Sequence, residues 1–132
     1  MPHGFQERAQ LHIAEAAFYA GEYESAARQA NALLEESSVS LYADDLRLVI
    51  ADSSVALGDT PKALALYGEV GKVKIGFEAH YARYRTGSIL RAQGKEQGEV
   101  LLNEVIKWAE RGERGALLRV LKNEAPLPPL AM

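Results

Sequence analysis

Apolar side chains recur at helical spacing along most of this chain, and the clearest case is the stretch 43–70. Its first half carries one apolar stripe: Leu46, Ile50, Ala51 and Val55. Its second half carries another: Ala63, Leu66, Tyr67 and Val70. Between them, Gly58 can take the left-handed conformation that ends a helix, and Asp59 and Pro61 suit the start of the next one. The stretch therefore predicts two antiparallel helices joined by a tight turn.

The glycine in this turn has counterparts along the chain. Gly21, Gly58 and Gly94 are separated by 37 and 36 residues. Seven residues before each glycine stands a small residue: Ala14, Ala51 and Gly87. Each return helix also carries a small residue near its start: Ala26, Ala63 and Gly98, the last after a turn one residue shorter. A fixed period of this length predicts helical hairpins that repeat along the chain.

The expected fold is all-α. We expect seven helices at about 6–20, 23–36, 41–57, 61–71, 76–93, 97–111 and 114–123. Three prolines in the tail 125–132 fit neither a helix nor a sheet, so the tail is expected to be separate. Residues 126–129 match a PxxP pattern, but a disordered tail is the simpler interpretation.

This pattern resembles the tetratricopeptide repeat (TPR) family. The matching positions in the central copy are Ile50, Ala51, Gly58, Ala63 and Tyr67, and those in the first copy are Ile13, Ala14, Gly21, Tyr23 and Ala26. The family's early tryptophan is replaced by Gln10, Arg47 and Arg83, and no proline closes a second helix. These longer repeats look more like the bacterial envelope and adaptor branches of the family.

The resemblance implies a right-handed α-solenoid of three helix-turn-helix repeats, at about 6–38, 41–73 and 76–111. A capping helix at 114–123 would complete a domain over residues 1–124. In this family the first helix of each repeat lines a groove that holds a partner peptide or helix. The residues that the alignment assigns to this groove are Arg8, Glu15, Tyr19, Asp45, Leu48, Asp52, Tyr81, Tyr84, Arg85, Ser88 and Arg91.

The groove residues change character along the chain, from acidic in the first two copies to aromatic and basic in the third. Tyrosine and arginine are enriched where interfaces gain most of their energy. Replacing Tyr84 and Arg85 by alanine is therefore expected to weaken capture of a partner and leave melting unchanged. The alternative for each residue is an ordinary solvated helix face.

Composition argues against several other classes of function. The 132 residues include no cysteine, and the formal net charge of −3 does not suit a surface that binds nucleic acid. No apolar run is long enough to insert into a membrane. His3, His12 and His80 lack metal-ligand spacing, and neither a phosphate-binding glycine loop nor a serine elbow is present. We therefore expect no enzyme activity, metal or cofactor.

Two hypotheses follow. The first is a non-enzymatic adaptor or scaffold module, cytoplasmic or associated with the cell envelope, that binds a protein partner in its groove. The second is a structural module that self-associates, for instance as a homodimer through its C-terminal end or its proline-rich tail, or a piece of a longer TPR protein.

Overall fold

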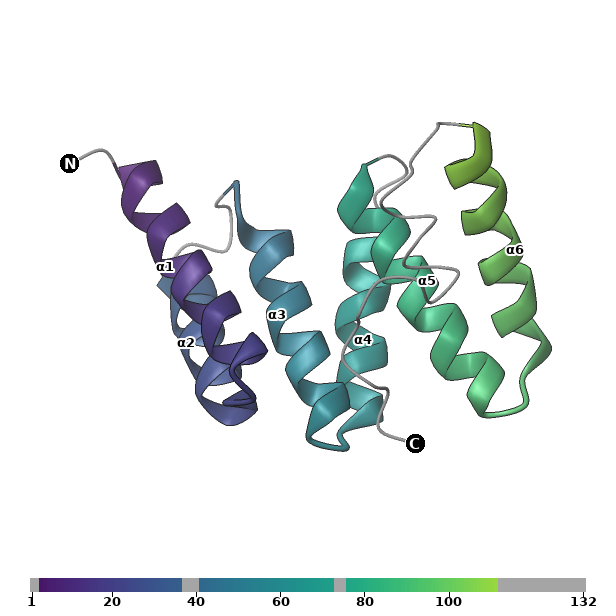
Figure 1. The fold of residues 1–132 in the computed structure, drawn as a ribbon, viewed down its shortest axis with the longest axis horizontal. Helices are drawn as coiled ribbons and strands as arrows, with labels where there is room; N and C mark the ends of the chain where they lie inside the picture. Colours follow the sequence, from purple (N-terminus) through teal and green to yellow (C-terminus); the bar gives the residue numbers. More distant parts are fainter. Residues whose placement is uncertain (1–2, 37–40, 73–75, 112–132) are drawn as a thin grey trace. The chain divides into compact units, whose positions relative to one another are not determined.

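The computed structural model describes residues 3–36, 41–72 and 76–111, and within these ranges the chain forms six α-helices and no strand (Figure 1). The helices are α1 His3–Tyr19, α2 Tyr23–Glu36, α3 Ala43–Ala56, α4 Thr60–Gly71, α5 Phe77–Ala92 and α6 Glu96–Arg111. The all-α prediction is confirmed for this part of the chain. The largest difference in bounds is at α1, which begins at His3 instead of residue 6. The predicted helix 114–123 and the tail 125–132 lie outside the described residues.

The same turn joins the helices of each hairpin. Gly21, Gly58 and Gly94 have φ values of 84°, 85° and 77°. In the first turn the N–H of Gly21 donates to the Phe18 carbonyl at 3.0 Å, and the next N–H donates to the Ala17 carbonyl at 2.9 Å. The turns at Gly58 and Gly94 repeat both hydrogen bonds at the same spacings. This pair of bonds is the Schellman motif, so the predicted turn glycines are confirmed at all three places.

The described helices divide into two compact units between Leu66 and Tyr67, a point inside α4. In the N-terminal unit, α2 packs against both α1 and α3, and α1 also contacts α3. Its core consists of Leu11, Ala14, Ala17, Phe18, Ala26, Ala30, Leu46, Val49 and Ile50. Leu66, from the first part of α4, packs against the same core. The small residues predicted at helix contacts, Ala14 and Ala26, are fully buried there.

The C-terminal unit is built on the packing of α5 against α6. Tyr84, Leu102, Val105 and Ala109 form a buried cluster between these helices. Gly87 and Gly98 let the two backbones approach closely, because a Cβ atom added at Gly98 would lie 2.7 Å from the Gly87 carbonyl oxygen. The small residues of the third copy are thus a requirement of this helix contact.

Candidate functional site

The predicted groove residues of the N-terminal unit lie on α1 and α3. Arg8 and Tyr19 are exposed, whereas Glu15, Asp45 and Asp52 are half-buried, as is Leu48. On α1, the spacings of seven and four residues place Arg8, Glu15 and Tyr19 on one side of the helix. Glu15 and Asp52 occupy equivalent positions of successive copies, 37 residues apart. The repeat period therefore places an acidic residue at the same position of α1 and α3.

Tyr19 is the centre of this face. It stands at the C-terminal end of α1, is 77% exposed, and has its ring edge-on to Phe18 with the ring centroids 5.2 Å apart. Partial burial raises the pKa of the Tyr19 hydroxyl, and the negative charges of Asp52 and then Glu15 raise that pKa further. One of these carboxylates comes from α3 and the other from α1, and both disfavour the charged form of the hydroxyl. We call Glu15, Tyr19 and Asp52 the acidic face.

His12 also belongs beside this face, although it was not among the predicted groove residues. Its Nδ1 atom lies 2.9 Å from Glu15 Oε1, and the imidazole is exposed. Its spacing could have predicted this place: His12 comes four residues after Arg8 and three before Glu15, so all three share one side of α1. An exposed imidazole in this position can donate to the carboxylate or, when protonated, form an ion pair with it.

In the C-terminal unit the structure corrects three of the predicted groove positions. Tyr84, Arg85 and Ser88 are buried, with exposed fractions of 9%, 2% and 9%. Tyr84 is part of the cluster between α5 and α6. Arg85 donates from Nε to the Tyr67 hydroxyl at 3.2 Å, and its guanidinium lies 5.9 Å from the centre of the Tyr67 ring. The prediction that these positions face an open groove is therefore wrong, and alanine at Tyr84 and Arg85 is now expected to lower the melting temperature.

Of the other predicted positions on α5, Arg91 is exposed and Tyr81 is half-buried. Tyr81 stacks on Phe77, with ring centroids 6.4 Å apart and planes 12° apart, and Phe77 is 51% exposed. Phe77 is an exposed aromatic residue that the sequence reasoning missed. The predicted α5 positions that remain at least partly accessible are therefore Tyr81, near the start of the helix, and Arg91, near its end.

His80 has a structural role in the same unit. Its imidazole stacks on Trp108 of α6, with the ring centroids 3.7 Å apart and the planes 14° apart. Arg83 places Nη1 3.4 Å from His80 Nδ1 and donates from Nε to the Gly71 carbonyl at 3.0 Å. Because this histidine is largely buried against an aromatic ring, it serves to join α5 to α6.

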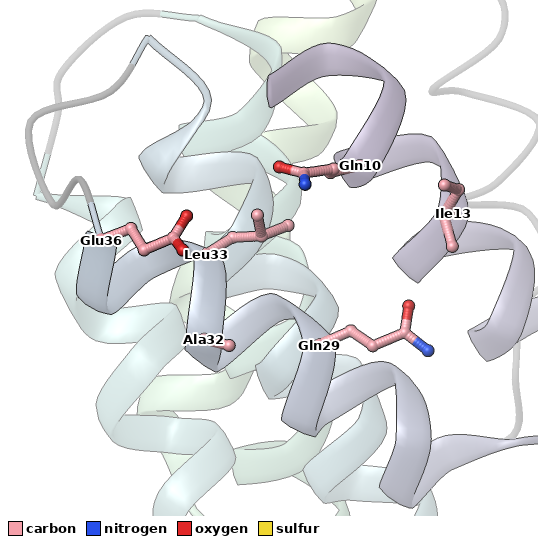
Figure 2. Close-up of a pocket in the computed structure, with 6 residues that line it drawn as sticks. All are labelled: Gln10, Ile13, Gln29, Ala32, Leu33 and Glu36. Carbon is pink, nitrogen blue, oxygen red and sulfur yellow. The ribbon is translucent and has the colours of Figure 1, made fainter. Parts of the chain in front are cut away.

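A second feature of the N-terminal unit is an open hollow between α1 and α2, with a volume of about 280 Å³. Figure 2 shows Gln10 and Ile13 of α1 on one side of it and Gln29, Ala32, Leu33 and Glu36 of α2 on the other. The sequence did not predict this hollow. Its lining is mostly apolar or uncharged, with Glu36 as the one charged lining residue among those described.

The residues that the structure describes contain no group of three or more His, Asp or Glu side chains arranged to hold a metal ion. Within the same ranges, no helix combines the length and the apolar character needed to cross a bilayer.

Comparison with family models, curated proteins and solved structures returned no match. The candidate sites come from the structure alone, and they are two surfaces of the N-terminal unit: the acidic face and the hollow.

Proposed function

We propose that this protein is a non-enzymatic protein–protein interaction module built as a right-handed solenoid of TPR-like hairpins. Three turns with the same pair of hydrogen bonds, each placed seven residues after a small residue, support the repeat. Close packing of small residues at Ala14, Ala26, Gly87 and Gly98 supports the same interpretation. The first helix of each hairpin then supplies the surface that meets a partner.

The observation that carries the proposal is the acidic face. An exposed tyrosine that feels the negative charges of carboxylates from two helices offers both aromatic area and negative potential. Tyrosine contributes large contact area at low entropic cost, and complementary charge raises the rate and specificity of association. A protonated Tyr19 can also donate a hydrogen bond, and its raised pKa keeps the hydroxyl protonated over a wider pH range. The partner that fits is a helix or extended segment carrying lysine or arginine.

The test uses a synthetic lysine-containing amphipathic peptide as the probe and a glutamate-containing version of the same peptide as its counterpart. Fluorescence anisotropy should show that the full chain binds the lysine peptide more tightly and that added salt weakens the binding. The substitutions Tyr19→Ala and Asp52→Asn should each weaken binding by about five- to thirtyfold, the range for interface residues that cost about 1–2 kcal/mol.

The matched control is Glu104→Gln, which removes an exposed carboxylate from α6. It should leave binding of the lysine peptide unchanged. Equal binding of both peptides, or an equal loss in Asp52→Asn and Glu104→Gln, would mean that the acidic face recognises no partner of this kind.

A further inference from the structure

The hollow between α1 and α2 exposes an isoleucine whose equivalent in the next hairpin of the same unit is buried. Ile13 and Ile50 are equivalent residues of successive copies, 37 positions apart. Ile50 is 2% exposed and belongs to the core that includes Ala26 and Ala30 of α2. Ile13 is 59% exposed. Ile13 of the first hairpin is therefore open to solvent. The equivalent Ile50 of the second hairpin is buried in a core to which α2 contributes.

The surroundings of Ile13 suit a second helix. Leu33 is half-buried beside the hollow, and Ala32 is a small exposed residue that lets another backbone approach. Gln10 and Gln29 flank the apolar part from α1 and α2 (Figure 2). Gln29 already donates from Nε2 to Ser25 Oγ at 2.9 Å. A carboxamide has a second N–H and an oxygen, so both side chains can still pair with identical side chains of another copy.

Two oppositely charged side chains stand along α2 beside the hollow: Glu36 lines it, and Arg28 lies one turn before the lining residue Ala32. Arg28, Ala32 and Glu36 follow one another at intervals of four residues along α2, and all three are exposed. Among the described residues, neither Arg28 nor Glu36 forms an ion pair or a side-chain hydrogen bond. Opposite charges therefore stand one turn on either side of a small residue, about 12 Å apart along the helix axis.

We propose that this face is a two-fold interface between two copies of the chain. A two-fold axis near Ala32 places the two α2 helices antiparallel, so that Arg28 of each copy meets Glu36 of the other. The same operation directs Ile13 and Leu33 of each copy toward the apolar hollow of the other. A two-fold interface must be self-complementary, and the order basic, small, acidic along α2 satisfies that condition for antiparallel helices.

The experiment is a charge swap in the full chain, read by sedimentation equilibrium across a concentration series. The wild-type protein should show a monomer–dimer equilibrium. Arg28→Glu and Glu36→Arg should each raise the dimer dissociation constant by about tenfold or more, because each creates two like-charge contacts in the dimer. The double variant Arg28→Glu/Glu36→Arg restores opposite charges and should return the constant to within about threefold of wild type. Ile13→Ser should weaken the dimer without a charge change.

Glu104→Arg is the matched control, since it reverses an exposed helical charge on α6 and should leave the equilibrium unchanged. Circular dichroism of every variant should match wild type, because each substituted side chain is more than one-third exposed. A monomeric wild type, a dimer insensitive to the single swaps, or a double variant as weak as its parents would each overturn the proposal. The peptide-binding test of the acidic face uses other residues, so the two proposals can fail separately.

Discussion

At the scale of single residues, Tyr19 gives a direct test of the acidic face. Replacing Asp52 by asparagine removes the larger of the two charge effects on the hydroxyl, so the pKa of Tyr19 should fall. The chain has six tyrosines, and the Tyr19 signal is best isolated as the difference between the tyrosinate absorbance titrations of each protein with and without Tyr19→Phe. An unchanged difference titration in Asp52→Asn would show that the carboxylate does not act on Tyr19.

The same pKa has a consequence for stability, with a definite sign. The folded chain holds the Tyr19 proton to a higher pH than the unfolded chain, whose tyrosine pKa is near 10.0. The stabilisation is therefore fully present below that pH and is lost as the pH rises through the folded pKa. Between neutral and strongly alkaline pH, the free energy of unfolding should fall less in the Tyr19→Phe variant than in wild type. Urea unfolding at the two pH values measures this difference.

Two helical glycines make a matched pair of predictions. Gly98→Ala should destabilise the protein by about 1–3 kcal/mol, since the new Cβ would lie within 2.9 Å of the α5 backbone at Arg91 and Gly87. Gly68 of α4 has no atom within 4 Å of the corresponding position, and Gly68→Ala should stabilise by about 1 kcal/mol through helix propensity. Urea unfolding measures both. Equal effects of the two substitutions would contradict the close contact of α5 with α6.

At the scale of elements, the sequence predicts helices and turns well because their signals are local. A glycine after an apolar turn is enough to locate Gly21, Gly58 and Gly94, and the run Asp59, Thr60 and Pro61 indicates the start of the next helix. In the structure Asp59 Oδ1 accepts a hydrogen bond from the Lys62 N–H at 3.3 Å. These choices depend only on neighbouring residues, so periodicity and capping rules suffice.

Helix α5 shows where such reasoning fails. Eight of its residues are buried, including His80, Arg85 and Ser88. Tyrosine, arginine and serine are often found on protein surfaces, so the sequence predicts that these α5 side chains are exposed. A buried arginine can nevertheless be held by an aromatic ring and a hydroxyl, as Arg85 is by Tyr67. Only the three-dimensional packing reveals such a partner, which lies 18 residues away in the sequence.

The corrected role of Tyr84 leads to a prediction for the α5–α6 hairpin. Tyr84→Ala should lower the free energy of unfolding by about 3–5 kcal/mol, because it empties a buried aromatic position between the helices. Arg91→Ala, at an exposed position of the same helix, should change it by less than about 0.5 kcal/mol. Urea unfolding distinguishes them. A small effect at Tyr84 would mean that its buried ring contributes little to the stability of the α5–α6 hairpin.

At the scale of the whole molecule, the two candidate surfaces differ in how far the sequence could predict them. The repeat period relates Glu15 to Asp52, so the acidic face follows from the alignment of copies. The same period makes Ile13 and Ile50 identical, although one is exposed and the other buried. Exposure depends on which helix lies next to a hairpin, and a periodic pattern does not carry that information. The hollow could therefore be found only from the structure.

The division of the chain inside α4 leads to the last prediction. Leu66 packs in the core of the N-terminal unit, whereas Tyr67 and Val70 belong to the C-terminal unit and are fully buried. Ala65 is an exposed residue of this shared helix. Ala65→Pro should cost about 3 kcal/mol or more, because proline removes a helix hydrogen bond and clashes with the preceding turn, while Ala65→Gly should cost only about 1 kcal/mol. Hydrogen exchange should then show faster exchange in both α2 and α6 of Ala65→Pro, because one helix supplies side chains to both units. Faster exchange confined to one of these helices would mean that the two units unfold independently.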